Sequence, residues 1–188
     1  KFDRTGACAD LPTEPANSNF KNKVTIGAYA IQEHAGVVWI YMGAKESQPP
    51  FPKYLWTTVP ETHRIQAKWI QDANWLQSLE GGIDTVHASY LHNEAYGPGT
   101  APGSERSTLM TDDTTPRLEL EYTAYGFRYA AIRKAASDDE RYVRITPHVM
   151  PCSSYPPASI GKNRIWNMWV PRDDNSCWAW DVCFNEIT

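Results

Sequence analysis

One stretch of nineteen residues constrains this chain more than any other, because it concentrates polar side chains that can bind a metal ion. Residues 74–92 read NWLQSLEGGIDTVHASYLH. No other stretch of the sequence has a comparable density of carboxylates, imidazoles and amides. We predict a helix from about Asn74 to Leu91. The groups of interest on it are Asn74, Glu80, Asp84, His87 and His92.

The spacing of these residues decides which of them can act together. At about 100° per residue, Glu80, Asp84 and His87 lie on one face of a regular helix. His87 and His92 lie about 140° apart on the same helix, which is too far to share one small ion. If both bind one metal, the helix must kink, widen or end between them. The alternative is a helix with a polar, solvent-exposed face, in which Asn74 is only an N-cap and the histidines bind nothing.

Composition favours a packed globular chain and excludes several classes of function. Of 188 residues, 41% are hydrophobic and 21% are charged, so a folded core is expected. The net charge of −4 argues against a nucleic-acid groove and against binding to an anionic membrane surface. No run of eighteen apolar residues exists, which argues against a transmembrane span. Four cysteines without a Cys-x-x-Cys motif indicate reduced thiols in a cytoplasmic protein.

The order of predicted elements indicates an α+β fold built on an antiparallel sheet. A hairpin is predicted from strands at 24–31 and 37–41. Three prolines among residues 49–52 mark the best candidate domain boundary. A strand at 64–71 leads to the helix, and a glycine- and proline-rich loop at 93–108 follows it, long enough to act as a lid. The later strands of an antiparallel meander are predicted at 118–124, 127–134, 141–149, 164–170 and 177–184.

The joint pattern Asn-Trp-x4-Glu-x3-Asp-x2-His-x4-His resembles the iron-site signature of the Rieske non-haem iron oxygenases. These are the oxygenase alpha subunits of aromatic-ring hydroxylases and O-demethylases. The wording NWLQSLEGGID is most similar to the phthalate 4,5-dioxygenase branch of the family. The resemblance covers essentially the whole chain. Further matches to that branch are TAYG at 123–126, RIT at 144–146, MP at 150–151 and VPRDD at 170–174.

The resemblance implies a mononuclear Fe(II) held by two histidines and one carboxylate. The histidines would be His87 and His92, and the third ligand, an Asp, is expected beyond Thr188. In the family, the carboxylate matching Asp84 bridges between a histidine of a Rieske cluster and a histidine of the iron. Asp84 can also orient the ring of His87, one turn away. The amide matching Asn74 lies near the iron, so the resemblance implies that Asp84 and Asn74 are catalytic residues.

The resemblance further implies that the chain is an internal piece of a longer protein. Residues 1–48 are expected to be the C-terminal remnant of an all-β Rieske domain. Residues 49–188 are expected to be the N-terminal part of a catalytic domain of the helix-grip type. No Cys-x-His or Cys-x2-His pair is present, so the ligands of a [2Fe–2S] cluster are expected upstream. The carboxylates considered as in-chain third ligands, and disfavoured, are Asp173, Asp174 and Asp181.

The implied activity is O2-dependent oxidation of an aromatic substrate by hydroxylation, dihydroxylation or O-demethylation. Electrons would come from an NAD(P)H-dependent reductase, through the Rieske cluster of a neighbouring subunit in a homotrimer or larger ring. The branch often accepts aromatic carboxylates, which a guanidinium can bind through two parallel hydrogen bonds. The candidate arginines are Arg106, Arg117, Arg133 and Arg144.

Two other classes of function stay open on the residues alone. The first is a zinc-type hydrolase that uses His87, His92 and a carboxylate. The second is a non-catalytic binding module of the same helix-and-sheet shape, with inert histidines. Dependence on O2 and NAD(P)H would separate an oxygenase from the hydrolase, and metal analysis would separate it from the binding module.

Overall fold

The computed structural model describes residues 1–92, 109–110, 112–135, 137–157 and 163–185. The predicted loop 93–108, with the candidate Arg106, therefore lies outside the described residues. The chain divides into two compact units, Lys1–Thr58 and Val59–Thr188. In the part of the chain that the structure describes, no helix is long and apolar enough to cross a membrane.

The first unit is built around a β-hairpin. Strands β1 (Ala30–His34) and β2 (Val37–Tyr41) pair antiparallel. Ala35 and Gly36 connect them with φ angles of 55° and 78°, the left-handed conformation that a tight two-residue turn requires. The predicted first strand began earlier, at residue 24. Thr25 pairs instead with Ala7 of the N-terminal segment, so the hairpin itself starts later. The unit also has three short 3-10 helices: η1 (Phe20–Lys23), η2 (Lys45–Ser47) and η3 (Leu55–Thr57).

The proline-rich segment at 49–52 packs within the first unit. The ring of Phe51 meets Trp39 edge-on with centroids 5.4 Å apart, and Tyr54 stacks on Trp39 at 5.7 Å. Such aromatic pairs are worth about 0.5–1.5 kcal/mol each beyond the area they bury. The compact unit therefore ends after the prolines, at Thr58, whereas the predicted boundary precedes them. Its kinship with a Rieske domain stays a prediction.

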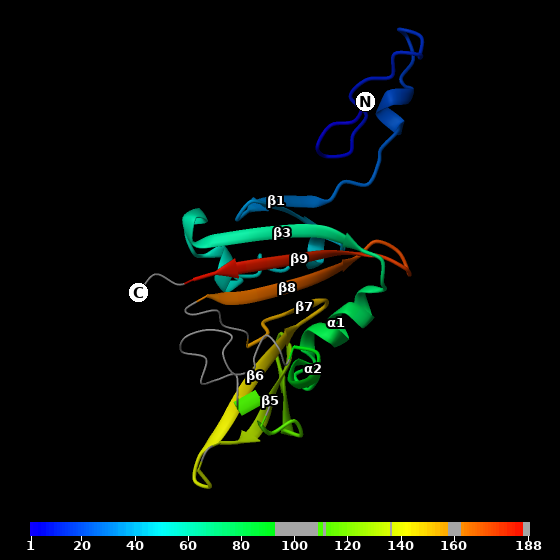
Figure 1. Cartoon of the computed structure of the whole chain (residues 1–188). Coiled ribbons are helices and arrows are strands. Elements are labelled where there is room, and N and C mark those ends of the chain that lie inside the picture. Colours follow the sequence, from blue (N-terminus) through cyan, green and yellow to red (C-terminus); the bar gives the residue numbers. More distant parts are fainter. Residues whose placement is uncertain (93–108, 111, 136, 158–162, 186–188) are drawn as a thin grey trace. The chain divides into compact units, whose positions relative to one another are not determined.

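The second unit is an antiparallel sheet with short helices on one face (Figure 1). Among the described residues the sheet has seven strands, in the order β3-β9-β8-β7-β6-β5-β4. This confirms the predicted α+β class with an antiparallel sheet. The strands predicted in this unit agree with the observed ones within one residue at each end, and β7 was not predicted. The strands are β3 (Arg64–Gln71), β4 (Arg117–Thr123), β5 (Gly126–Lys134), β6 (Arg141–Val149), β7 (Ser153–Ser154), β8 (Arg164–Pro171) and β9 (Cys177–Phe184), and a 3-10 helix η4 (Glu61–His63) precedes β3.

The predicted single helix is two helices, α1 (Trp75–Ile83) and α2 (His87–Tyr90). The prediction of one continuous helix is therefore wrong. The chain leaves the helical conformation at Asp84, whose φ and ψ are −73° and 116°. Its carboxylate accepts hydrogen bonds from the backbone N–H groups of Val86 and His87, at 2.7 and 3.2 Å. Aspartate competes in this way with helical hydrogen bonding, ending one helix and starting the next.

α1 packs against the middle of the sheet through a small apolar core. Leu79 of α1 is buried against Trp169 of β8 and against the β9 residues Cys177 and Ala179. Gly82 makes the close approach possible, because a Cβ built there would lie 2.1 Å from the ring of Trp169. The glycine thus fixes how near the helix lies to β8.

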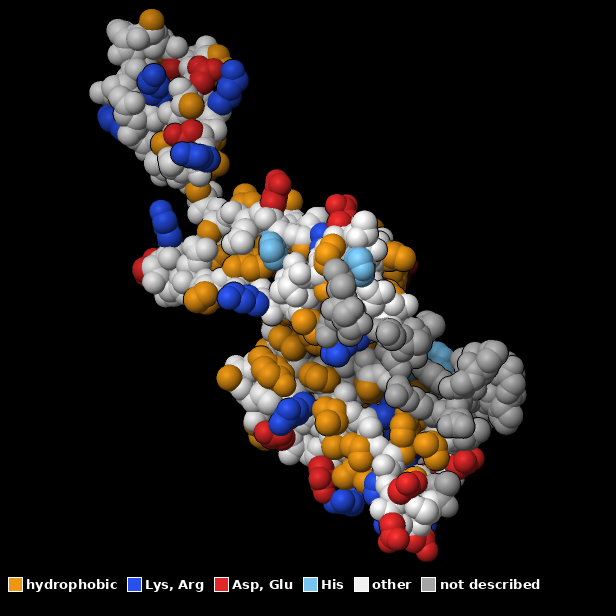
Figure 2. All heavy atoms as spheres, turned by 90° about the vertical axis from the view of Figure 1, so that its left-hand side faces the viewer, with side chains coloured by type: hydrophobic (Ala, Val, Ile, Leu, Met, Phe, Trp, Pro, Cys, Tyr) orange, Lys and Arg blue, Asp and Glu red, His pale blue; other side chains and the backbone are white. Residues whose placement is uncertain are grey.

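Apolar side chains remain exposed where β4, β5 and β6 form the end of the sheet. Figure 2 shows hydrophobic side chains gathered over the lower part of the second unit, with acidic and basic side chains among them. Strand alternation places Val143 and Ile145 of β6 on one face of the sheet. On the other face, the edge strand β4 carries three side chains that are more than half exposed: Leu118, Leu120 and Tyr122.

Candidate metal centre and the cavity beside it

Two histidines meet at the short helix α2. His87 is its first residue and His92 follows its end, and their ring centroids lie 5.2 Å apart with the planes at 68°. The helix end expected between two histidines that share one ion is thus present. Neutral imidazoles are good ligands for Fe(II) as well as for zinc. In the described ranges, no group of three or more His, Cys, Asp or Glu residues gathers closely enough to hold a metal.

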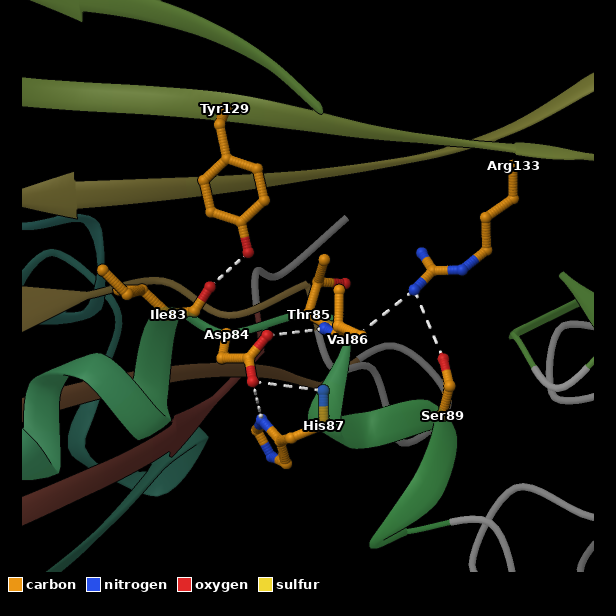
Figure 3. Close-up of polar contacts among 8 residues, drawn as sticks. All are labelled: Ile83, Asp84, Thr85, Val86, His87, Ser89, Tyr129 and Arg133. Atoms are coloured by element: carbon orange, nitrogen blue, oxygen red, sulfur yellow. Dashed lines mark hydrogen bonds and ion pairs between the residues drawn. The ribbon is translucent and has the colours of Figure 1, made fainter. Parts of the chain in front are cut away.

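Asp84 lies beside His87 and is held by backbone. Its Oδ2 is 3.5 Å from Nδ1 of His87, without hydrogen-bond geometry, and this buried nitrogen has no hydrogen-bond partner among the described residues. The same carboxylate accepts hydrogen bonds from the N–H groups of Val86 and His87, where α2 begins (Figure 3). A carboxylate facing Nδ1 favours the tautomer with a proton there, which leaves the lone pair of Nε2 for a metal. Asp84 is therefore placed to orient a ligand.

The corner between α1 and α2, at residues 83–85, is also held by side chains of strand β5 (Figure 3). The hydroxyl of Tyr129 donates to the backbone oxygen of Ile83, the last residue of α1. The Arg133 guanidinium donates from Nη2 to the oxygen of Thr85 at 3.2 Å and to Oγ of Ser89 at 3.4 Å. Arg133 is only 1% exposed, and it does not line the cavity described below. Burial, and secondarily the nearby Arg144, lower the pKa of this guanidinium.

A cavity of about 200 Å³ opens between this corner and the sheet. Asp84, His87 and His92 all line it on the helix side. The polar side chains on the sheet side are Arg144 and Thr146 of β6 and Asn167 of β8.

Arg144 is nine-tenths buried on the cavity wall. Its Nη1 lies 2.8 Å from Sδ of Met110, and its Nε has no hydrogen-bond partner among the described residues. A buried guanidinium with an unmatched N–H suits an anionic ligand, because a carboxylate can accept two parallel hydrogen bonds from it.

The other predicted site residues lie elsewhere. Asn74 caps α1: its Oδ1 accepts from the N–H of Leu76 at 2.9 Å, and its Nδ2 donates to the backbone oxygen of Asp174 at 3.0 Å. Arg117 is exposed on β4 and pairs with Glu119. The structure thus brings Asp84, His87, His92 and Arg144 to one cavity, and it brings neither Asn74 nor Arg117 there.

The sequence prediction missed Thr146 and Asn167. Thr146 could have been found from Arg144, because alternate residues of a strand share a face. Asn167 stands between Trp166 and Met168 in an otherwise apolar strand, which is itself a signal of a special role. Its Nδ2 donates to the carboxylate of Asp181 on the neighbouring strand, and burial raises the pKa of that carboxyl.

Solved structures with a similar fold are terminal oxygenases. The terminal oxygenase of carbazole 1,9a-dioxygenase from Nocardioides aromaticivorans IC177 superposes with a TM-score of 0.61 at 15% identity, covering 97% of this chain and 55% of that one. Dicamba monooxygenase superposes with a TM-score of 0.65 at 14% identity, covering 97% of this chain and 56% of that one. The fold is that of the catalytic part of Rieske-type terminal oxygenases.

Sequence comparison identifies the family within this class of oxygenases. Residues 40–187 match the family model described as LigXa C-terminal domain like, and the chain belongs to that family. It is 37% identical over 180 residues to the phthalate 4,5-dioxygenase oxygenase subunit of Pseudomonas putida, covering 93% of this chain and 41% of that protein. It is 34% identical over 175 residues to the 3-chlorobenzoate-3,4-dioxygenase oxygenase subunit of Comamonas testosteroni, covering 93% and 40%. The predicted family is confirmed, and the chain spans about two fifths of the length of these relatives.

Proposed function

We propose that this chain carries part of the catalytic centre of an oxygenase that uses O2 to oxidise an aromatic carboxylate. One observation supports this proposal above all. Two histidine rings lie 5.2 Å apart on one wall of a cavity whose opposite wall carries a buried arginine. The pair suits a metal, and the arginine suits an anion.

Different residues of the chain would then bind the metal and the substrate. His87 and His92 would hold a mononuclear Fe(II), together with a carboxylate from outside the described residues. Two neutral imidazoles and one carboxylate leave ligand positions open, so the bound iron supplies the chemistry that activates O2. Asp84 orients the His87 ring through Nδ1 and so keeps Nε2 available.

Arg144 would bind the carboxylate of the substrate. Its guanidinium is removed from water, so an ionic hydrogen bond to it is stronger than at the surface. The substrates in the names of two relatives, phthalate and 3-chlorobenzoate, are aromatic carboxylates, which agrees with this assignment. Arg133 is a weaker candidate, because it does not line the cavity, although its Nη1 also has no hydrogen-bond partner among the described residues.

Electron supply requires partners. We propose an NAD(P)H-dependent reductase as donor, a Rieske [2Fe–2S] cluster in the longer protein, and a cytoplasmic homotrimer or larger ring in which a neighbour's cluster serves each iron. The oxygenase of carbazole 1,9a-dioxygenase has been solved in complex with a ferredoxin, which is a precedent for a separate electron-donor protein binding to this fold. Asp84 would link the cluster to His87.

The proposal is tested on the full-length protein with variants of the two walls. We expect His87→Ala and His92→Ala each to lose the mononuclear iron on dialysis, which lowers the iron content below that of the wild type without removing the iron of the proposed cluster. We expect Arg144→Gln to retain iron and to bind benzoate about 10–100-fold more weakly, because a hydrogen bond to a charged group is worth roughly 1.5–3 kcal/mol. Iron is measured by metal analysis and benzoate binding by calorimetry.

Arg117→Gln is the matched control, since Arg117 is exposed and pairs with Glu119. It should change neither iron content nor benzoate affinity. A wild-type protein that holds zinc instead of iron at His87 and His92, and that consumes no O2 with NAD(P)H, would contradict the proposal in favour of a hydrolase. A protein that holds no metal would favour a binding module.

A further inference from the structure

The corner between α1 and α2 depends on side chains from outside the helices. The last carbonyl groups of a helix have no partner within it and must find one elsewhere. Ile83, the last residue of α1, finds the hydroxyl of Tyr129. Thr85, inside the break, finds the guanidinium of Arg133. Both partners come from β5, and Figure 3 shows them reaching the corner on either side of Asp84.

The two accepting carbonyls lie on either side of Asp84 in the sequence. The Asp84 carboxylate in turn binds the N–H groups of Val86 and His87 and faces the His87 ring. Hydrogen bonds therefore link β5 to the backbone on both sides of Asp84, and the Asp84 carboxylate lies 3.5 Å from Nδ1 of the His87 ring without a hydrogen bond to it. The Asp84 side chain is 45% exposed, and its two hydrogen bonds to backbone N–H groups hold it in place.

Filling space in the core does not by itself require a buried arginine such as Arg133. It is 1% exposed, and the acceptors it meets are neutral: the oxygens of Thr85 and Asp113 and the hydroxyl of Ser89. Burying a charge is unfavourable even with the attraction of the nearby Asp113 carboxylate, and apolar residues often replace buried charged groups without loss of stability. Three directed hydrogen bonds define a geometry, which apolar packing does less well.

We propose that Tyr129 and Arg133 are positioning residues that fix Asp84 and His87 in the geometry needed for metal binding. The inference rests on the proposed function. Neither residue touches metal or substrate; both act through the backbone of the corner. Because Tyr129 pairs with Thr146 and Ala131 with Arg144 across β5 and β6, the same strand pair carries the opposite wall of the cavity. One rigid frame thereby sets both walls.

The test is the Fe(II) affinity of the full-length protein, measured by competition with a chelator under anaerobic conditions. We expect Tyr129→Phe and Arg133→Met each to weaken Fe(II) binding about 10–100-fold, the range found when groups that orient metal ligands are removed. The electron paramagnetic resonance line shape of the ferric protein should change as well, since it reports ligand geometry and not stability.

Matched controls are available in the same strands. Tyr122→Phe removes the hydroxyl of an exposed tyrosine on β4, and Arg128→Met removes an exposed arginine of β5 that pairs with Glu121. Both should leave the affinity and the line shape unchanged. Tyr129→Phe keeps the aromatic ring and is expected to fold, so it still tests the inference if Arg133→Met does not fold.

The outcomes separate the two ideas. Wild-type protein that holds no Fe(II) overturns the proposed function and this inference with it. Wild-type protein that holds Fe(II), while folded Tyr129→Phe holds it equally tightly with an unchanged line shape, overturns this inference alone.

Discussion

At the scale of single residues, Asp84 shows how one carboxylate can serve both the backbone and a site. It ends α1, accepts two backbone hydrogen bonds where α2 begins and faces the ring of His87. A carboxylate that already accepts two backbone hydrogen bonds is held at one position and one orientation. The proposed role of Asp84 as an orienting group for His87 agrees with this local backbone chemistry.

Asn74 offers a test of whether an amide at the start of α1 does more than cap it. Losing the cap in Asn74→Ala should lower the free energy of unfolding by about 1 kcal/mol, while Asn74→Ser keeps an acceptor and should lower it less. Chemical denaturation of the two variants measures this. If Asn74 is only a cap, the full-length Asn74→Ser protein keeps wild-type turnover. Lost turnover at unchanged stability would instead support the catalytic role predicted from the family.

His148 predicts an acid-sensitive component of stability. It is buried on β6, where Nδ1 lies 3.0 Å from the oxygen of Ser153, and burial lowers the pKa of its ring. The unfolded chain, with a histidine pKa near 6.5, then binds more protons than the folded chain below that pH. The free energy of unfolding should therefore fall as pH drops from about 7.5 to 5.5.

The variant His148→Gln isolates this component. Its stability should depend less on pH over the same interval, even if it is lower overall. Urea denaturation at several pH values measures the slopes. Parallel slopes for the wild type and the variant would show that His148 contributes nothing to the pH dependence.

At the scale of elements, the close contact between α1 and β8 rests on one glycine of a pair. Gly82→Ala places a methyl group against the ring of Trp169, and such overpacking costs about 1–3 kcal/mol. Gly81 has open space around its Cβ position, so Gly81→Ala should raise stability by up to about 1 kcal/mol through helix propensity. Thermal or chemical unfolding should show a loss of stability for Gly82→Ala and a gain for Gly81→Ala. Equal changes in stability would mean that the contact with Trp169 is not tight.

The elements differ in how far the sequence predicts them. The strands of the second unit alternate clearly, as in β6, and their bounds could be predicted closely. The break at Asp84 could not, because residues 74–91 have helical spacing throughout and the competing hydrogen bonds of one side chain decide the outcome. β7 has two residues, too few for any periodicity.

The candidate site was predictable in the same uneven way. His87, His92 and Asp84 lie within one short motif, so the sequence alone points to them. Arg144 could be proposed only as one of four arginines, because selecting it requires knowing which strand faces the helices. Tyr129 lies 46 residues from the carbonyl it meets, a distance over which local pattern carries no information.

At the scale of the whole molecule, the exposed edge of the sheet predicts self-association of the isolated 188-residue chain. Among the described residues, β4 is the last strand of the sheet, and Leu120, 57% exposed, lies at its centre. Unpaired edge strands with apolar side chains recruit other strands. Leu120→Lys should therefore reduce light scattering of concentrated solutions.

The control for this prediction is Ile26→Lys. Ile26 is similarly exposed, at 51%, but it lies outside the named strands. It should have little effect on scattering. Equal effects of both variants would assign the change to net charge and not to the edge of the sheet.

The corner held by β5 has a consequence for the order in which the protein matures. His87 and His92 emerge from the ribosome together, but the side chains that fix their surroundings follow 46 and 48 residues after the carbonyls they bind. A nascent chain that ends before β5 therefore contains both imidazoles but lacks the β5 side chains that hold the corner next to them. Under the proposed function, metal capture is therefore expected at a late stage of biosynthesis, after the meander has joined the sheet.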